Sequence, residues 1–383
     1  MGKFKGMKIG VVCYPSLGGS GVIATELGVA MSKMGHEVHF ITSSQPIKLD
    51  LFSHHVFFHE VSVKRYPLFK YDPYESALTS KIVDIVKHHS LDILHVHYAL
   101  PHASAAYLAK QILLSQGISI PVVTTLHGTD ITLVGKDPAF EPVITFSINS
   151  SDVVTTVSES LKEDTLSHFK VEKDIKVVPN FVCVEKYKGA PDVCHKKAFA
   201  PNGEKILMHI SNFRKVKRIE DAIKAFNIVQ KSIPCKFLLV GDGPERAMLE
   251  GLVREFGLED KVVFFGAIKD VETALCAADL FLLPSESESF GLVALEAMAA
   301  SVPVLSTNSG GLPEVNIDGV TGFLNDVGDY KKMAENCLKL LSDDILYEKF
   351  SSQSLSRAKQ LDVALVAPKY EELYFEELSK QEL

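Results

Sequence analysis

Two glutamates flank a short polar turn that leads into an apolar helical stretch. Glu288 and Glu296 are eight residues apart, with Gly291 between them. An apolar run at residues 280–283 precedes the turn and is typical of a buried strand. A strand entering a helix through such a turn presents free backbone N–H groups and the positive end of the helix dipole. A phosphate could bind at this helix N-terminus, and the carboxylates of Glu288 and Glu296 could accept hydrogen bonds from sugar and ribose hydroxyls on either side of it. The alternative is that Glu288 only complements the dipole and Glu296 is solvated.

Four cations within residues 214–218 follow a second strand-like run, at residues 205–210. Cations before a helix oppose its dipole, so they cost stability unless an anion binds there. This conflict between position and local preference predicts a diphosphate site, with Arg214 and Lys217 as its ligands. No Asp-x-Asp metal motif follows a predicted strand, so neutralisation of a diphosphate would fall to these cations. The alternative is a solvated run of charges.

A glycine-rich turn, residues 18–21, follows the first predicted strand and opens the first helix. Its glycines let the backbone approach a ligand, and the helix N-terminus favours an anion. The turn is not G-x-G-x-x-G, and the second strand ends at Thr42 without an acidic residue, so a dinucleotide site is disfavoured. The alternative is a tight turn without a ligand.

Histidines gather near the ends of two other strands. His95 and His97 share one strand face. A metal site there is disfavoured, because the spacing suggests no carboxylate or cysteine partner. Polar groups at the edge of a cleft, with Tyr98 and His102 within reach of a substrate, are the preferred interpretation.

His127 lies where a strand turns into a loop, next to a glycine. It could donate a hydrogen bond to a hydroxyl or a phosphate. Asp130 could orient this histidine or cap the segment after it. The alternative is a histidine that faces the core.

Composition restricts the class of protein. The chain has 383 residues, which suits two domains, and 46% hydrophobic with 23% charged residues is typical of soluble proteins. The net charge of -8 argues against a nucleic-acid partner. No apolar run approaches the ~20 residues that span a bilayer. The first residues lack the apolar core of a signal peptide, so we expect a cytoplasmic protein.

The six cysteines contain no C-x-x-C pair, which favours reduced thiols. Cys13, Cys235 and Cys276 lie in or beside apolar runs, so we expect them to be buried. Cys183, Cys194 and His195 fit no zinc pattern.

Strand and helix patterns alternate twice along the chain, which predicts two parallel sheets covered on both faces. The pattern lapses between residues 181 and 203, where we expect a linker. Ser158 is placed to cap a helix that begins at Glu159. The predicted strands are residues 8–14, 37–42, 56–61, 93–97, 122–126, 153–157, 175–178, 205–210, 236–240, 262–265, 280–283, 302–306 and 322–324. The predicted helices include residues 22–34, 77–89, 103–116, 218–231, 245–256, 271–277 and 290–300.

The predicted fold class is therefore α/β, with two doubly wound Rossmann-like domains at residues 7–182 and 204–361. We expect the C-terminal helix, about residues 362–383, to pack back on the first domain. Ligands of such sheets bind at the carboxyl ends of the strands. If the two sheets face each other, one cleft collects both sets of loops.

These motifs together resemble the retaining glycosyltransferases of family 4, which have the GT-B fold. The family's Glu, seven residues, Glu motif is matched by Glu288-Ser-Phe-Gly-Leu-Val-Ala-Leu-Glu296, and the resemblance covers essentially the whole chain. One departure concerns Asn212. It stands five residues before Lys217, where the family usually has Arg, so Arg214 is displaced from the family position.

Within the family, residues 13–28, 95–102, 126–130 and 210–218 resemble the enzymes that join N-acetylglucosamine to L-malate and so open bacillithiol biosynthesis. This resemblance implies UDP-N-acetylglucosamine as donor, L-malate as acceptor and retention of the anomeric configuration. It implies small-molecule substrates without a metal or cofactor, and no nucleic-acid or membrane partner. A homo-oligomer is left open.

The resemblance also implies roles for individual residues. The catalytic residues implied are His127, Lys217 and Glu288. The acceptor-binding residues implied are Ser20, Tyr98, His127 and Thr129. The donor-binding residues implied are Gly19, Asn212, Arg214, Lys217, Gly241, Glu288, Ser289, Phe290, Gly291, Leu292 and Glu296.

Three alternatives remain open at this point. One is another retaining family 4 transferase with a lipid or sugar acceptor, for which residues 64–71 are the only hint of a basic, apolar face. A second is a UDP-sugar epimerase. The third is a non-catalytic sensor of a nucleotide sugar.

Overall fold

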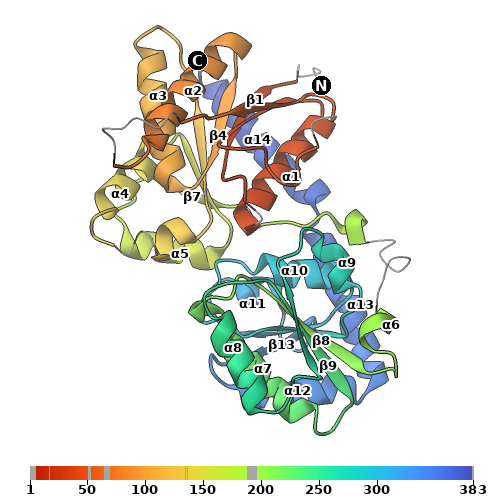
Figure 1. Ribbon diagram of the computed structural model, residues 1–383. Helices are drawn as coiled ribbons and strands as arrows, with labels where there is room; N and C mark the ends of the chain where they lie inside the picture. The colour runs from red at the N-terminus through yellow and green to blue at the C-terminus, as the bar shows by residue number, and fades with distance from the viewer. Residues whose placement is uncertain are drawn as a thin grey trace. The chain divides into compact units, whose positions relative to one another are not determined.

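The computed structural model describes residues 6–16, 18–50, 53–63, 70–133, 135, 137–187 and 196–381. The chain divides into two compact units. Unit 1 comprises Met1–Asn180 and Val363–Leu383, and unit 2 comprises Phe181–Asp362. Each unit is built on a parallel sheet with helices against it (Figure 1). The predicted fold class, two doubly wound Rossmann-like domains, is confirmed.

The sheet of unit 1 has the order β3-β2-β1-β4-β5-β6-β7, and all its neighbouring strands are parallel. The order reverses between β1 and β4, which is where doubly wound sheets bind their ligands. The strands are β1 (Lys8–Val12), β2 (Glu37–Thr42), β3 (Val56–Glu60), β4 (Ile93–His97), β5 (Val122–Leu126), β6 (Val153–Thr156) and β7 (Ile175–Val177).

The helices of unit 1 connect these strands. They are α1 (Gly19–Lys33), α2 (Tyr74–His89), α3 (Ser104–Leu114), α4 (Glu141–Ser150), α5 (Glu159–His168) and α14 (Val363–Gln381), with short turns η1 (Ala99–Ala103) and η2 (Thr129–Leu133). The predicted cap of α5 is confirmed, because Ser158 Oγ accepts the backbone N–H of Leu161 at 3.0 Å.

Helix α4 was not predicted from the sequence. Ile144 and Ile148 are buried, whereas Val143 is 42% and Phe146 is 49% exposed. Apolar residues therefore lie on both faces of α4, and this blurs the 3.6-residue period on which the prediction depends.

The C-terminal helix α14 lies in unit 1, far in sequence from the elements it contacts. It packs against α1, and its ribbon runs among the N-terminal elements of the chain (Figure 1). Tyr370 and Tyr374 are among the largest fully buried side chains. The Tyr374 hydroxyl lies 2.6 Å from His95 Nδ1 in the middle of β4. The helix is therefore part of the core of unit 1.

The sheet of unit 2 has the order β10-β9-β8-β11-β12-β13 and is also parallel throughout. Its order reverses between β8 and β11. The strands are β8 (Lys205–Ile210), β9 (Cys235–Val240), β10 (Val262–Gly266), β11 (Leu280–Leu283), β12 (Val304–Thr307) and β13 (Gly322–Asn325).

Helices cover the sheet of unit 2, and its core includes Phe213, Phe226 and Phe237. The helices are α6 (Lys196–Phe199), α7 (Ile219–Val229), α8 (Arg246–Glu255), α9 (Val271–Leu275), α10 (Leu292–Ala299), α11 (Leu312–Val315), α12 (Tyr330–Leu341) and α13 (Asp344–Gln360), with short turns η4 (Val184–Tyr187) and η6 (Lys215–Lys217). None of the helices in the described part of the chain has the length and apolar character needed to cross a membrane.

The described cysteines are free thiols. Cys13 and Cys235 are buried as predicted, and burial raises the pKa of each thiol to about 12. The prediction for Cys276 was wrong. It is partly exposed because it caps the short helix α9, where its Sγ donates to the carbonyl of Thr273. Cys194 and His195 lie outside the described residues.

Candidate active site

In unit 2, a cation and a carboxylate meet where the sheet order reverses. Lys217 Nζ, on the loop after β8, forms an ion pair with Glu288 Oε1, on the loop after β11. Ser285 Oγ donates to the same oxygen at 2.9 Å. The Lys217 and Glu288 side chains are 20% and 14% exposed, so the pair is largely shielded from solvent. The structure thus brings together two residues that lie 71 positions apart in the sequence.

Backbone contacts and a second ion pair hold these loops. The N–H of Glu286 donates to the carbonyl of Val216 at 2.8 Å and ties the two loops together. Arg218 adopts left-handed backbone angles at the start of α7, and its Nε lies 2.7 Å from Asp221 Oδ2. That hydrogen bond raises the pKa of Arg218. Two of the four cations therefore have carboxylate partners within the chain, which offsets the predicted conflict with the dipole of α7.

The turn before α10 differs from its prediction. Gly291 has φ 89°, and α10 begins only at Leu292. Glu296 is therefore the fifth residue of the helix, little more than one turn inside it, whereas the helix predicted from the sequence begins at residue 290. No side chain caps this helix, so the amides of its first turn remain suited to an anion.

A glycine turn after β12 packs directly against this segment. The N–H of Gly311 donates to the carbonyl of Glu288 at 2.8 Å. Gly310 has φ 59°, and a Cβ there would lie 2.1 Å from the Glu288 carbonyl oxygen. Only glycine allows so close an approach. The position of Glu288 thus depends on the loop after the neighbouring strand.

His209 is a buried residue of this region that was not predicted from the sequence. Its Nδ1 lies 2.7 Å from the Leu282 carbonyl and its Nε2 lies 2.7 Å from Ser211 Oγ. Burial lowers its pKa to about 4. The neutral ring therefore donates from Nδ1 and links β8 to β11 near the ion pair. A histidine near the carboxyl end of an apolar strand was the signal available in the sequence.

The other residues predicted to bind a donor fall into two groups. Asn212 and Arg214 are exposed on the loop after β8. Ser289, Leu292 and Glu296 are partly buried around the start of α10, where Phe290 is buried.

Two glycines predicted to bind a donor lie elsewhere. Gly241 has φ 128°, and a Cβ there would lie 1.8 Å from the Ser211 carbonyl oxygen, so packing alone requires glycine at this position. Gly19 is the first residue of α1 and lies in unit 1.

In unit 1, all four residues predicted to bind an acceptor lie together. Ser20 Oγ, in the first turn of α1, is 2.6 Å from the Tyr98 hydroxyl, on the loop after β4. Thr129 lies close enough to the Tyr98 hydroxyl to act on its pKa. The rings of Tyr98 and His127 are 5.4 Å apart. Burial raises the pKa of Tyr98 to about 12, so it keeps its proton and can donate at neutral pH.

His127 is paired with a second histidine. Its Nε2 lies 2.8 Å from His97 Nδ1. Burial lowers the pKa of His127 to about 3, so the ring is neutral. His97 Nε2 is buried without a partner among the described residues, and an orphaned N–H there would be costly. We therefore assign the shared proton to His97 Nδ1, which leaves His127 Nδ1 as a hydrogen-bond donor.

Asp130 is buried between the loops that carry Tyr98 and His127. Its carboxylate accepts the backbone N–H of Ala99 at 2.9 Å and of Gly128 at 3.0 Å. Burial raises the pKa of Asp130, while these backbone hydrogen bonds act in the opposite direction. The carboxylate thus fixes the two loops against each other through their backbone amides.

His95 uses both ring nitrogens within the protein, Nδ1 with Tyr374 and Nε2 with Thr125 at 2.7 Å. Among the described residues, the one group of side chains close enough to hold a metal ion is elsewhere in unit 1, at His39, His59 and His89.

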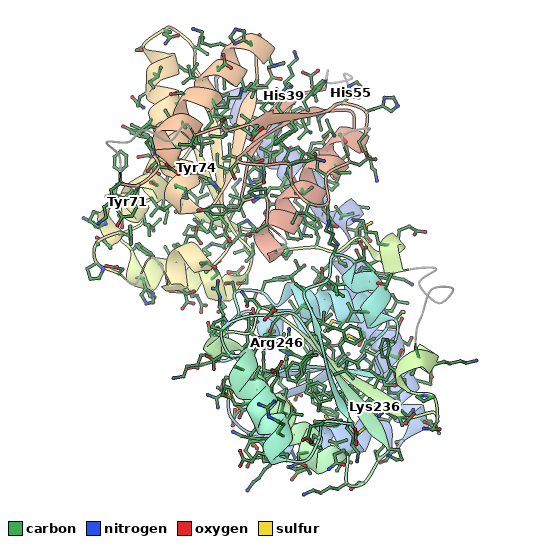
Figure 2. All side chains as sticks on the ribbon, in the orientation of Figure 1. His39, His55, Tyr71, Tyr74, Lys236 and Arg246 are labelled. Carbon is green, nitrogen blue, oxygen red and sulfur yellow. The ribbon has the colours of Figure 1, made fainter. Side chains whose placement is uncertain are left out.

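The sequence hint of a lipid acceptor falls mostly outside the described residues, since 64–69 are not among them. Lys70 Nζ lies 5.5 Å from the centre of the Tyr71 ring. Tyr71 is 77% exposed and points away from the body of unit 1 (Figure 2).

Two protein families match the chain in succession. Residues 17–186 match the model of Glycosyltransferase Family 4, and residues 192–357 match the model of Glycosyl transferases group 1. The chain is also 46% identical to N-acetyl-alpha-D-glucosaminyl L-malate synthase of Bacillus anthracis, over 97% of each chain. It belongs to the family 4 glycosyltransferases.

Solved structures agree with this glycosyltransferase fold. Anabaena Alr3699/HepE in complex with UDP and glucose matches with a TM-score of 0.79 and 22% identity, over 96% of this chain and 99% of that one. Sucrose-phosphate synthase from Thermosynechococcus elongatus matches with a TM-score of 0.78 and 22% identity, over 98% and 100%. At this level of identity the two structures show the fold alone, and the fold is that of GT-B glycosyltransferases.

Proposed function

We propose that this glycosyltransferase moves N-acetylglucosamine from UDP-N-acetylglucosamine to the hydroxyl of L-malate, as the first step of bacillithiol biosynthesis. The observation that carries the proposal is 46% identity over 97% of both chains to a protein whose name states the sugar and the malate. UDP as the carrier is supported by the Anabaena structure, which is a complex with UDP and glucose. The two groups of polar side chains supply chemistry that suits a charged donor and a small acceptor.

The donor would bind to unit 2. Lys217, with Arg214 beside it on the same loop, would bind the diphosphate together with the amides of the first turn of α10. Lys217 would have to leave Glu288 to do so. The Glu288 carboxylate would then be free to accept hydrogen bonds from sugar hydroxyls, while Glu296 accepts them from the ribose. When the donor binds, Lys217 would therefore exchange the Glu288 carboxylate for the diphosphate.

The acceptor would bind to unit 1. Helix α1 has no side-chain cap and no acidic residue in its first turn, so its N-terminus suits a carboxylate of malate. Ser20 and Tyr98 offer hydroxyls at the same place, with Thr129 beside them. His127 Nδ1, which carries the proton in the assignment above, would donate a hydrogen bond to the malate hydroxyl.

The transfer would proceed on one face of the sugar. The bond from the anomeric carbon to the phosphate oxygen breaks, and its electron pair leaves with UDP. The malate oxygen attaches on the same face, and its proton passes to the departing phosphate. Lys217 and Arg214 would stabilise the charge that develops, at about 3 kcal/mol for a well-placed donor. This chemistry needs no divalent ion.

The test is release of UDP from UDP-N-acetylglucosamine with and without L-malate, with EDTA present. We expect release only with L-malate, and a product whose anomeric proton coupling in NMR shows the α configuration. Succinate is the matched control acceptor, because it keeps both carboxylates and lacks the hydroxyl.

Three results would contradict the proposal. Turnover without malate, or equal turnover with succinate, would exclude malate as the acceptor. Turnover abolished by EDTA in folded protein would exclude metal-independent transfer. A new UDP-sugar formed without acceptor would indicate an epimerase, and preference for a lipid or sugar would indicate another transferase of the family.

A further inference from the structure

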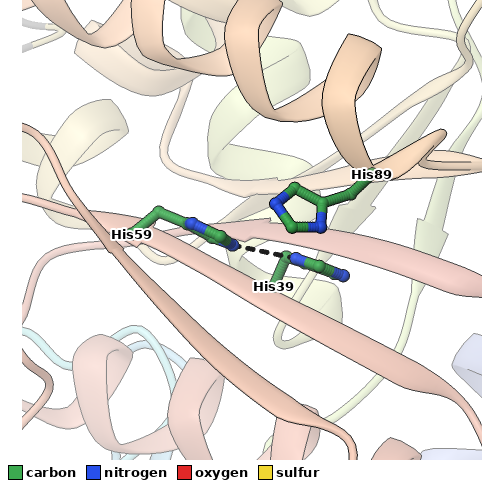
Figure 3. A group of neighbouring side chains, drawn as sticks. All are labelled: His39, His59 and His89. Atoms are coloured by element: carbon green, nitrogen blue, oxygen red, sulfur yellow. Dashed lines mark hydrogen bonds between the residues drawn. The ribbon is translucent and has the colours of Figure 1, made fainter.

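Three histidines of unit 1 lie together on the face of the sheet covered by α2. His39 comes from β2, His59 from β3 and His89 from the last position of α2 (Figure 3). His39 shares a face of β2 with Ile41, and Ile41 is the Cα partner of His59. Ile41 belongs to the same core cluster as the apolar residues of α2. Three elements distant in sequence therefore converge on one point.

The separations of the ring nitrogens suit a metal ion. One nitrogen from each ring lies within 4.8 Å of the others, and His39 Nδ1 is 2.8 Å from His59 Nε2. Tetrahedral Zn²⁺ with Zn–N distances of 2.0–2.1 Å requires nitrogens about 3.3 Å apart. His39 Nδ1 and His59 Nε2 are closer than this value and the three nitrogens lie within 4.8 Å of one another, so rotations of the rings would bring them to it. His39 is buried, and His59 and His89 are partly exposed, which leaves a route for entry.

A carboxylate orients the central histidine. Glu37 Oε1 lies 2.9 Å from His39 Nε2. An ionised carboxylate can only accept, so Nε2 carries the proton and Nδ1 presents its lone pair to the other two rings. Metal-binding histidines in proteins are usually held in this way by a carboxylate on the second nitrogen. To bind with Nε2, His59 needs only to move its proton to its other nitrogen.

The surroundings suit a cation held by imidazole nitrogens. The C-terminus of α2 adds the negative end of a helix dipole, which favours positive charge near His89. Lys8, a nearby cation, is engaged by the His89 carbonyl at 2.9 Å and by Glu37. Lys81 and Asp84, which carry opposite charges, also lie near His59.

We propose that His39, His59 and His89 bind a divalent transition metal ion of the zinc class, with Glu37 as the carboxylate that orients His39. Imidazole nitrogens favour Zn²⁺, Co²⁺, Ni²⁺ and Cu²⁺ over Mg²⁺ or Ca²⁺. Solvent would complete the coordination on the exposed side.

The ion would stabilise the fold and take no part in transfer. The three histidines lie on β2, on β3 and at the end of α2, whereas the candidate acceptor residues lie on α1 and on the loops after β4 and β5. The metal would tie the edge strand β3 and its neighbour β2 to α2. This inference does not depend on the identity of the substrates.

The test is titration of EDTA-treated and desalted full-length protein with Co²⁺, followed by competition with Zn²⁺. We expect one equivalent of Co²⁺ to give the visible absorption of a four-coordinate site, and Zn²⁺ to remove that absorption and raise the melting temperature. Glu37→Gln should weaken binding about 10- to 100-fold without removing a ligand.

His88→Gln and His89→Gln form a matched pair in the last turn of α2. His88 is 71% exposed and pairs with Asp84, so its loss should leave binding unchanged, whereas His89→Gln and His59→Gln should each weaken it at least tenfold. His55→Asn is a second control, because His55 precedes β3 and points into solvent (Figure 2). The proposal would be overturned if the protein bound no stoichiometric Co²⁺. It would also be overturned if the His59 and His89 variants bound Co²⁺ as tightly as the unsubstituted protein.

Discussion

The two units share the order of six strands, and unit 1 adds β7, but they differ in the chemistry of their carboxyl-end loops. In unit 2 the loops carry opposite charges, Lys217 against Glu288 and Arg218 against Asp221. In unit 1 the corresponding loops carry hydroxyls and neutral imidazoles, with one buried carboxylate, Asp130, occupied by backbone amides.

The difference also appears in the distribution of histidine. Twelve of the fourteen histidines lie in unit 1, and the other two are His195 and His209. Burial lowers the pKa of His95 and His127 to about 3 and of His102 to about 4. The carboxyl-end loops of unit 1 thus offer uncharged hydrogen-bonding groups, and those of unit 2 offer ion pairs. The two sheets share the order of six strands, so this difference in chemistry lies in the loops that follow equivalent strands.

The largest expected effect is at the charged side of this comparison. Lys217→Ala should lower kcat about 100- to 1000-fold, because it removes a preformed cation from the leaving diphosphate and leaves Glu288 unpaired. Steady-state kinetics with UDP-N-acetylglucosamine and L-malate measures it. Lys215→Ala is the matched control, since Lys215 is exposed in the same short turn. Similar losses in both variants would show that Lys217 has no special role.

A smaller effect is expected at the neutral side. Tyr98→Phe keeps the ring but removes the hydroxyl that bonds Ser20, a loss of about 1 kcal/mol or somewhat more for one hydrogen bond. We expect KM for malate to rise about tenfold with little change in KM for the donor. Tyr107→Phe, at a ring packed edge-on against Phe146, is the control. A change confined to the KM for the donor would show that Tyr98 contacts the donor and not malate.

The smallest expected effect is a difference between the two units in how their stability depends on pH. A buried histidine with a lowered pKa binds fewer protons in the folded state than in the unfolded state, so it removes stability as the pH falls below about 6.5 toward its folded pKa. The raised pKa of Asp130 acts in the opposite sense, but it is one group against several histidines.

Hydrogen exchange, corrected for intrinsic rates, is the measurement. Between about pH 7 and about pH 5, amides of β4 and β5 should lose protection more than those of β8 and β11, where His209 is the one described histidine with a lowered pKa. An equal loss of amide protection in both sheets would contradict the predicted difference in pH dependence between the units.

Local pattern predicted much of the fold. The bounds of β2, β4, β5, β8 and β11 match their predictions, because each is a short apolar or β-branched run bounded by turn residues. The four residues that the resemblance assigns to the acceptor lie together, because loops after parallel strands collect at one edge, and their role in acceptor binding stays a prediction. The ends of α10 were not, because the positive φ of Gly291 shortens the helix and no local pattern shows it.

Contacts between distant segments could not be read from the sequence. The Lys217–Glu288 pair joins residues 71 positions apart, and it depends on a glycine turn after a third strand. The group formed by His39, His59 and His89 depends on the register of β2 with β3 and on where α2 ends. Spacing alone also left open whether Asp130 orients His127. In the structure its carboxylate accepts the backbone N–H groups of Ala99 and Gly128, and the sequence pattern does not predict where these loops lie.

The position of α14 bears on how the chain is made. Unit 2 is one continuous segment, whereas unit 1 is completed only by residues that follow it. During synthesis the ribosome therefore releases the whole of unit 2 before α14 emerges. Until then His95 lacks the hydroxyl of Tyr374, and the surface that α14 will cover on α1 stays open. The second unit can therefore acquire its structure before the core of the first unit is complete.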